Sequence, residues 1–424
     1  MDSIASIIEN TGENLFYCKI DTFKASKDYL QGGLCIRFVG VKPANKNFKD
    51  KEEGVETFIV DIDLWVFAKL LYKLPPNRET RNFIYSFEDD FEGNNNWYEL
   101  RIKPRHHELN YFYSTFSESR PRFFEIKDIR RVADPVLESQ PPLLSASAIQ
   151  KRIAAFGDWF EKERNTSQLT LRLEDSYFGG DFVLESFHVG QGMCSIVHNG
   201  KWGVLLDMGA GKPVVRPRYP MLSNDLHIVT SKLKSLNLII SHFDSDHWRI
   251  LAWDTNLREK IKNIYVPSGS LPLAFSDKNI KQKVVQIDNV TIDLGVNTSL
   301  RIHRSIPSKL DSNGDCLVAT FHKNGKIALA SGDYCYQRFG SDSNTSIKKL
   351  LSETYSAVIV PHHGDFESSK SIVSCVPGSP AFFSAGTHQG YNHPTSVSID
   401  EHRAKKFKVI EKRTEENIVR QVLM

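Results

Sequence analysis

The second half of this 424-residue chain is a succession of short apolar runs separated by polar turns. Residues 182–189 alternate between apolar and polar as a half-buried strand does, and two Asn-Gly pairs stand between apolar runs at the spacing of β-hairpins. Helical spacing occurs between the strands, so the pattern predicts an α/β domain. The expected strands lie at 182–189, 194–197, 202–206, 238–240, within 284–294, and at 316–321, 327–330 and 357–360, with helices near 225–235 and 396–405 and a closing strand pair at 407–410 and 418–422.

The first 178 residues follow a different pattern. Aromatic and β-branched residues gather in strand-length runs at 15–20, 34–39, 83–87, 97–102 and 123–126, and helical spacing occurs at 64–74. From Ser145 the chain has the pattern of an amphipathic helix, with Ile149, Ile153 and Trp159 on one face. We therefore predict a separate β-rich α+β domain over residues 1–143, a linker helix over 144–178 and the α/β domain over 179–424.

Composition describes an ordinary globular protein, since 40% of the residues are hydrophobic, 25% are charged and the formal net charge is +3. A balance so near neutral does not by itself favour a nucleic-acid partner. The six cysteines form no Cys-x-x-Cys pair, and the first residues lack the basic start and apolar core of a signal peptide. The most apolar window, 58–74, is interrupted by Asp61, Asp63 and Lys69, so it falls short of a membrane span. These features predict a soluble, cytoplasmic protein without a membrane partner.

Four residues of metal-ligating type follow the predicted strand 238–240 within six positions: His242, Asp244, Asp246 and His247. In an extended segment His242, Asp244 and Asp246 share one side, and a turn then brings His247 round to them. Imidazole suits zinc, iron or manganese, and carboxylates suit harder cations. A solvated polar loop is the alternative, but four ligand types with no lysine among them favour a site for one or two divalent ions.

The pattern resembles the His-x-His-x-Asp-His signature of the metallo-β-lactamase fold, with Asp244 in place of the usual second histidine. This form is typical of the branch that contains the C-terminal domain of the competence protein ComEC. The chain departs from that branch at His188 and Met193, where aspartate is usual. Other motifs of the branch are similar, in the same order, to Val189-Gly190-Gln191-Gly192, Leu205-Leu206-Asp207-Met208-Gly209, Ser331-Gly332-Asp333, Pro361-His362-His363-Gly364 and Tyr391-Asn392-His393-Pro394.

The resemblance implies an αββα sandwich over residues 179–424. It implies that Asp333 bridges two metal ions, that His362 or His363 completes the second one, and that Asp207 supports the ligands by hydrogen bonding. His393 would point into the site, where its imidazolium offsets charge on phosphoryl oxygens or protonates a leaving oxygen.

One ligand of the family is missing. Many members carry a histidine between the first motif and the bridging aspartate, and the matching stretch here is residues 313–318. His303 and His322 do not fit the motif and are expected to be structural. The first metal position is therefore expected to be the weaker one.

These assignments imply hydrolysis of a phosphodiester, with DNA as the expected substrate, and Asp246 as a base that orients the attacking water. Zn²⁺ or Mn²⁺ is the expected ion, with Mg²⁺ as a further option. Two alternatives stay open: hydrolysis of a small phosphodiester or ester, and a metal-bound binding or scaffold protein without turnover. By architecture alone, a soluble nuclease with an N-terminal domain for recognition or for docking a protein partner fits a bacterial antiviral system.

Overall fold

The structure, a computed structural model, describes residues 14–30, 33–42, 54–72, 96–106, 108–117, 120–132, 169–172, 181–269, 271–308, 313–388 and 390–424. The chain divides into two compact units. Unit 1 comprises Met1–Arg164 with Gly269–Gln282, and unit 2 comprises Asn165–Ser268 with Lys283–Met424. The strand predicted at 83–87 and the amphipathic helix predicted from Ser145 lie outside the described residues.

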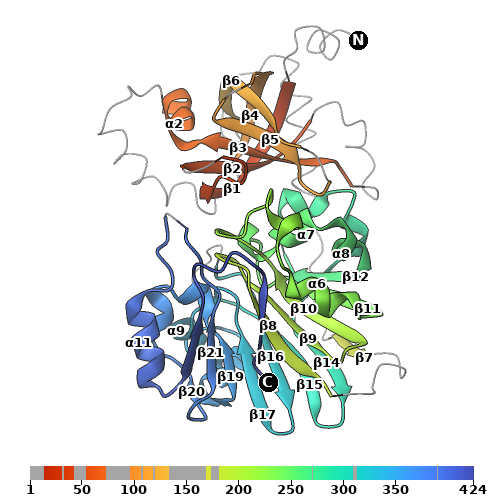
Figure 1. The fold of residues 1–424 in the computed structure, drawn as a ribbon, viewed down its shortest axis with the longest axis vertical. Coiled ribbons are helices and arrows are strands. Elements are labelled where there is room, and N and C mark those ends of the chain that lie inside the picture. Colours follow the sequence, from red (N-terminus) through yellow and green to blue (C-terminus); the bar gives the residue numbers. More distant parts are fainter. Residues whose placement is uncertain are drawn as a thin grey trace. The chain divides into compact units, whose positions relative to one another are not determined.

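Unit 1 is built on an antiparallel barrel, which closes among the described residues in the order β1-β2-β3-β5-β6-β4 (Figure 1). Side chains alternate along each strand, so that Ile36 and Phe38 of β2 point into a core that also contains Phe16 and Phe112. Helix α2 follows β3 directly, and its Phe67 packs into the same core. The elements are β1 (Asn14–Ser26), β2 (Leu34–Val41), β3 (Thr57–Asp63), α2 (Leu64–Tyr72), β4 (Trp97–Pro104), β5 (Asn110–Ser114) and β6 (Arg122–Val132).

The alternate side chains of β2 and β3 carry a buried charge network. Arg37 donates to both carboxylate oxygens of Asp61, at 2.8 and 2.7 Å, and to Asp28 at 3.0 Å. The hydroxyl of Tyr113 also donates to Asp28, at 2.9 Å. Because all of these side chains are buried, loss of the guanidinium would leave two carboxylates without a counter-charge.

The segment Gly269–Gln282 belongs to unit 1, although it lies in sequence between two strands of unit 2. Its Asp277 is buried and accepts hydrogen bonds from the N–H and the hydroxyl of Thr57, both at 2.8 Å. Val55 pairs with Asp277 in a parallel β-bridge. The sequence predicts this segment as part of the α/β domain, because nothing in its local pattern shows which core it joins.

Unit 2 contains two sheets that share a core. The first has the order β13-β12-β11-β10-β9-β8-β23 and the second the order β22-β21-β19-β17-β16-β15-β14-β7. Apolar side chains of both sheets meet between them, among them Trp202 and Ile239 of the first and Leu300 and Phe321 of the second. Helices α9, α10 and α11 cover the second sheet through another core, and α7 and α8 contact strands β10 and β12 of the first (Figure 1). The layers of unit 2 are thus helix, sheet, sheet, helix.

The strands of the first sheet are β8 (Val183–His188), β9 (Cys194–His198), β10 (Trp202–Met208), β11 (Ser235–Ile239), β12 (Ile261–Pro267), β13 (Val284–Ile287) and β23 (Val419–Val422). Those of the second are β7 (Leu169–Arg172), β14 (Val290–Gly295), β15 (Thr298–Arg304), β16 (Leu317–Lys323), β17 (Lys326–Ala330), β19 (Ala357–Ile359), β21 (Pro380–Phe383) and β22 (Lys408–Glu411). The α-helices of this unit are α6 (Asp225–Ser231), α7 (Arg249–Trp253), α8 (Thr255–Lys260), α9 (Tyr336–Phe339), α10 (Thr345–Lys349) and α11 (Ser396–Ala404).

Two local predictions are wrong. The closing strands, predicted as a pair, enter different sheets: β22 pairs with β21 and β23 pairs with β8. Residues 169–172, predicted as part of the linker helix, form the edge strand β7, which pairs with β14. In both cases a short segment takes its structure from a partner that is distant in sequence.

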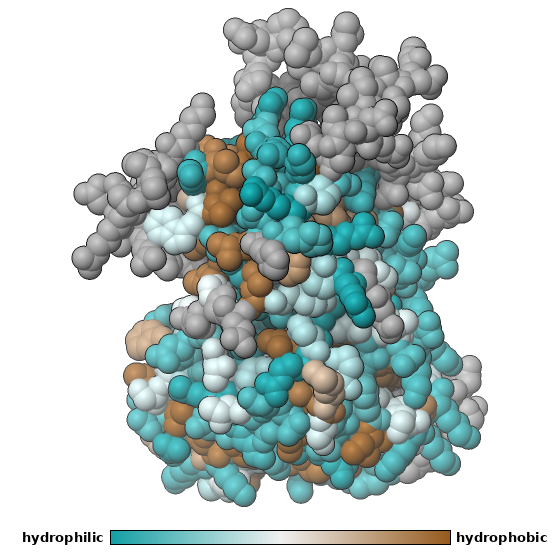
Figure 2. All heavy atoms as spheres, turned by 45° about the horizontal axis from the view of Figure 1, so that its top comes forward, coloured by the Kyte–Doolittle hydropathy of each residue, from teal (hydrophilic) through white to brown (hydrophobic). Residues whose placement is uncertain are grey.

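No helix among the described residues is both long and apolar enough to cross a membrane. On the face drawn in Figure 2, hydrophilic residues predominate and hydrophobic residues form small patches among them. The large hydrophobic side chains that are most exposed, such as Met221 and Val296, are far apart in sequence.

Candidate metal centre

The predicted ligands lie in loops that follow parallel strands of both sheets. His242, Asp244, Asp246 and His247 follow β11, Asp333 follows β17, and the pair His362 and His363 follows β19. The loop after β11 is extended at Asp244, but a 3₁₀ turn at Ser245–His247 then reverses it. The prediction of one extended segment is therefore wrong beyond Asp244, because the turn places both Asp246 and His247.

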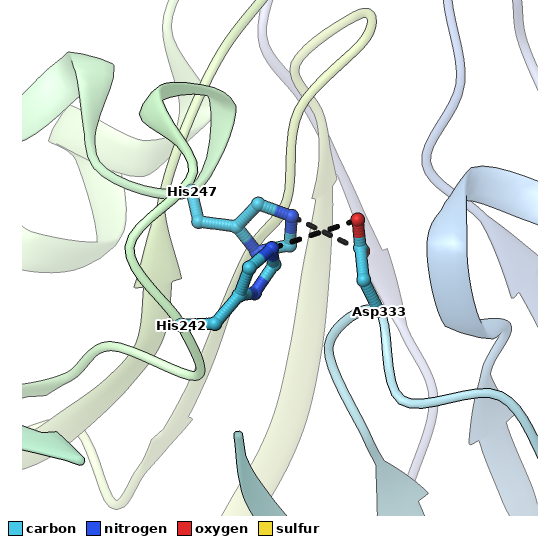
Figure 3. Close-up of side chains that lie close together, drawn as sticks. All are labelled: His242, His247 and Asp333. Atoms are coloured by element: carbon cyan, nitrogen blue, oxygen red, sulfur yellow. Dashed lines mark ion pairs between the residues drawn. The ribbon is translucent and has the colours of Figure 1, made fainter. Parts of the chain in front are cut away.

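Asp333 lies at the middle of the predicted ligands. Its Oδ1 is 3.2 Å from Nε2 of His247 and 3.9 Å from Nε2 of His363. Its Oδ2 is 3.6 Å from Nε2 of His242 and 3.7 Å from Nε2 of His362. Figure 3 shows His242 and His247 pointing at Asp333 from the opposite loop. Two ligands that are each about 2.1 Å from a tetrahedral ion are about 3.4 Å apart, so these spacings match ligands of a shared ion.

Four buried atoms at this centre have no hydrogen-bond partner among the described residues. They are Nε2 of His242, His247 and His363, and Oδ1 of Asp333. Buried polar atoms are nearly always paired, and each one left unpaired costs free energy. Imidazole nitrogens and a carboxylate oxygen that face one point form the donor set that a divalent ion of the zinc or manganese type prefers. The residues therefore fit a divalent ion.

The remaining carboxylates of the motif lie at the sides of this cluster. Asp246 Oδ2 is 3.2 Å from His363 Nε2, and Asp246, His247 and His363 together form a second possible ligand set. Asp244 Oδ2 is 3.5 Å from His242 Nε2, and its side chain is 38% exposed. All seven predicted ligands thus lie in one neighbourhood.

Asp207 supports His247. Its Oδ1 accepts the N–H of Ser241 at 2.7 Å, and its Oδ2 accepts the Ser241 hydroxyl and Nδ1–H of His247, both at 2.8 Å. A proton held on Nδ1 leaves the lone pair on Nε2, the nitrogen that faces Asp333. Nδ1 of His363 lies 2.7 Å from the carbonyl oxygen of Ser384, which fixes that ring in the same way. This is the geometry that the predicted supporting role of Asp207 requires.

The carboxylates and imidazoles of the centre shift one another's pKa values. Burial alone would lower the pKa of His247, but Asp333 and Asp207 outweigh burial and raise it well above the usual value. Burial alone would raise the pKa of Asp333, but His247, His362 and His363 hold it well below the usual value. Asp333 is therefore an anion that the surrounding rings stabilise.

His393 lies beside the pair, with its ring centroid 5.6 Å from that of His362 and 6.3 Å from that of His363. Burial and these two imidazoles lower its pKa to about 3. A neutral ring is therefore the favoured form at this position, whereas the resemblance implies an imidazolium. Gln191 Oε1 accepts the Gly386 N–H, so its Nε2 donates to Nδ1 of His393 at 3.3 Å and leaves the ring proton on Nε2. Sequence reasoning missed this role of Gln191.

Three further features concern histidines outside the ligand sets, the stretch 313–318 and a third group of ligand-type residues. His322 Nε2 contacts the Thr320 hydroxyl on its own strand at 3.0 Å, and neither His322 nor His303 belongs to a ligand set among the described residues. The stretch 313–318 reaches the centre through Asn313, whose Nδ2 is 3.4 Å from His362 Nε2. A third set of ligand-type residues, Cys335, His362 and Asp365, was not expected from the sequence.

No protein-family model and no curated protein matches this chain. Among solved structures, a variant of the CmlA beta-hydroxylase is 12% identical, with a TM-score of 0.37 over 81% of this chain and 72% of the other. The metallo-beta-lactamase fold protein YhfI from Bacillus subtilis is 12% identical, with a TM-score of 0.33 over 57% of this chain and 100% of the other. Zn²⁺-bound PqqB from Methylobacterium extorquens is 12% identical, with a TM-score of 0.32 over 55% of this chain and 87% of the other.

Proposed function

We propose that unit 2 is a metal-dependent hydrolase of the metallo-β-lactamase fold, which acts on phosphodiesters and has DNA as its expected substrate. The observation that carries the proposal is the convergence of four unpaired, buried ligand atoms from three loops. His242, Asp244, Asp246, His247, Asp333 and the pair His362 and His363 would hold one or two divalent ions. Such ions, when bound, activate water and offset charge on the oxygens of the substrate.

Two side chains at the edge of the cluster are suited to handle protons. Burial alone would raise the pKa of Asp246, but His363 and His247 hold it below the usual value. Asp246 is therefore a carboxylate that accepts a hydrogen bond from water and orients it. His393, with its proton on Nε2, donates a hydrogen bond to an oxygen of the substrate.

Cations next to the centre favour an anionic substrate. The pKa of His388 is lowered to about 4 by burial together with the positive charges of Arg249 and Lys212, against the opposing effect of Asp246. Positive charge beside a metal centre attracts phosphate groups. The choice of DNA rests on the motifs that resemble the ComEC branch, and the antiviral role stays a prediction from architecture. A role of unit 1 in recognising DNA or docking a protein partner is likewise a proposal.

Cleavage assays on the full chain test this function. Wild type and the variants Asp246→Asn and Asp333→Ala are incubated with Mn²⁺, Mg²⁺ or Zn²⁺ and with plasmid, single-stranded DNA or the small diester bis(p-nitrophenyl) phosphate. Asp400→Asn, at a side chain that is 71% exposed, is the matched control. We expect the wild type and the control to cut DNA and the two site variants to lose at least 100-fold in rate.

Each other outcome identifies the part of the proposal that is wrong. Cleavage of the small diester alone would exclude DNA as substrate and keep the hydrolase. Metal binding without cleavage of any ester would favour a binding or scaffold protein. Equal rates in the wild type and Asp333→Ala would place the chemistry elsewhere.

A further inference from the structure

The two oxygens of Asp333 divide the histidines of the centre into two groups. Oδ1 is the closer oxygen to His247 and His363, and Asp246 lies 3.2 Å from His363 in the same group. Oδ2 is the closer oxygen to His242 and His362, and Asp244 lies 3.5 Å from His242 in that group. Each oxygen is therefore nearest to two imidazoles, one of which also has a carboxylate beside it, and the adjacent residues His362 and His363 fall into different groups.

The backbone of the pair accounts for this division. His362 (φ 48°, ψ 44°) and His363 (φ 55°, ψ 15°) are both left-handed, a conformation that residues other than glycine rarely adopt. Two such residues in a row are strained, and strain of this kind is held where the surrounding structure fixes it. Here the N–H of His362 donates to the carbonyl of Gly332 at 3.1 Å, which ties the turn to the loop that carries Asp333. The two rings lie 6.4 Å apart with planes at 55°.

Resting on the proposed metal centre, we propose that His362 is the ligand that completes the first metal position, in place of the family histidine that this chain lacks, and that Asp365 holds it there. The stretch 313–318, where that histidine is expected, contacts His362 through the amide of Asn313. An amide is a weaker ligand for zinc-type ions than an imidazole. The missing ligand is thus supplied from the other side of the cluster.

Asp365 is placed to orient His362. Its Oδ2 lies 3.0 Å from Nδ1 of His362, which directs Nε2 of the ring toward Asp333. Its Oδ1 accepts the N–H of Ser368 at 2.7 Å, and the thiol of Cys335 lies 3.9 Å from the same oxygen. These contacts to Oδ1 fix the position of the Asp365 carboxylate.

The set Cys335, His362 and Asp365 does not act as a third metal site in this arrangement. Its carboxylate oxygens and Nδ1 of His362 already have partners within the set or at Ser368. No side-chain atom of this set is among the buried unpaired atoms of the described residues, whereas Oδ1 of Asp333 and Nε2 of His242, His247 and His363 are. Asp365 is therefore a positioning residue for the first metal position.

Ion counting on the full chain tests the inference without use of activity. Apo-protein is titrated with Mn²⁺, bound manganese is counted per chain by mass spectrometry, and electron paramagnetic resonance distinguishes a coupled pair of ions from an isolated one. The matched variants are His362→Asn and His363→Asn, because asparagine tolerates the left-handed backbone of both positions. Each is also combined with Asp244→Ala, which damages the first position alone. His322→Ala is the control.

We expect two ions per chain in the wild type and the control, and one in each single histidine variant. His362→Asn with Asp244→Ala should still bind one ion at unchanged affinity, because both changes affect the same position. His363→Asn with Asp244→Ala should bind none tightly. Asp365→Asn should weaken the first ion by about 10- to 100-fold and replace the coupled spectrum by that of an isolated ion, with the second ion unchanged.

A single ion in the wild type, two ions in His362→Asn, or equal losses in the two double variants would overturn the inference. Unchanged affinities in Asp365→Asn would remove the role of Asp365, and this variant decides that point even where a histidine variant fails to fold. The expected ion counts without DNA cleavage would leave the inference standing and refute the nuclease. DNA cleavage by the wild type, together with two bound ions in His362→Asn, would refute the inference and leave the nuclease standing.

Discussion

Replacement of Asp207 by asparagine would show how far the metal centre depends on one proton. Oδ1 of Asp207 accepts the Ser241 N–H, and Oδ2 accepts from His247. Asparagine has to keep its oxygen toward the Ser241 N–H, so its NH₂ group turns toward His247. Because that group only donates, Nδ1 of His247 has to accept from it, and the ring proton moves to Nε2. The nitrogen that faces Asp333 then carries a proton and cannot bind an ion.

The size of the effect follows from the role of His247. Loss of the outer partner of a ligand weakens metal binding by about 10- to 100-fold, which is about 1.4–2.8 kcal/mol at 1.4 kcal/mol per tenfold. We expect Asp207→Asn at the upper end of this range. Asp207→Ala should be near the lower end, because the space it leaves can admit a water that accepts the Nδ1 proton. Asparagine, the closer mimic in size, is thus expected to be the more damaging change.

The assay is competition between the apo-protein and a chelating dye for Zn²⁺ or Mn²⁺, with Asp400→Asn as the control for the loss of one negative charge. The melting temperature of each apo-variant shows whether the fold is intact. Wild-type affinity in Asp207→Asn would refute the reasoning, since His247 would then bind no ion or would need no support. A larger loss in the alanine variant would refute the proton shift alone.

Three further predictions concern stability and backbone fit. Arg37→Met leaves two buried carboxylates uncompensated and should lower the free energy of unfolding by about 3–5 kcal/mol. Arg101→Ala, in an exposed pair, should lower it by less than about 1 kcal/mol. Equal midpoints of urea unfolding in the two variants would contradict this prediction. Burial lowers the pKa of His402 to about 4, so between pH 6.5 and 4 the unfolded chain binds a proton that the folded chain does not, and stability falls by about 3 kcal/mol as the pH drops to 4. His402→Phe should remove this part of the acid sensitivity, and a difference from wild type that stays constant from pH 7 to pH 4 would exclude it. In Gly209→Ala the new Cβ would lie 1.6 Å from the backbone oxygen of Asp246, whereas in Gly340→Ala its nearest neighbour is 3.5 Å away. Only Gly209→Ala should therefore lose bound metal on dialysis. Retention of metal in Gly209→Ala would contradict the close packing of Gly209 against the loop that carries Asp246.

Much of the centre can be anticipated from the sequence because ligand-type residues stand directly after apolar strands. Parallel strands present their carboxyl ends at one edge of a sheet, so residues after β11 and after β17 are expected to meet wherever such edges adjoin. The hairpins at the two Asn-Gly pairs and the helices α6 and α11 follow from local rules in the same way. These features depend on spacing and turn chemistry, which a single sequence contains.

The rest depends on contacts that a local pattern does not encode. The direction of His362 is set by a left-handed turn and by Asp365. The sequence His-His alone does not show that the two side chains point in different directions. The neutral state of His393 depends on burial and on His362 and His363, and the position of its proton depends on Gln191, which is 202 positions away in the chain. The strand β7 is likewise specified by β14, a partner that is distant in sequence.

The segment Gly269–Gln282 makes unit 1 a discontinuous domain. A fragment that ends before residue 269 would keep the barrel strands but would leave Thr57 without the carboxylate that its N–H and hydroxyl share. No single proteolytic cut can release the barrel whole, and a gene fusion that borrowed only the first part of the sequence would carry an unfinished fold. The ribosome therefore has to synthesise residues 165–268 of unit 2 before the last segment of unit 1 is available.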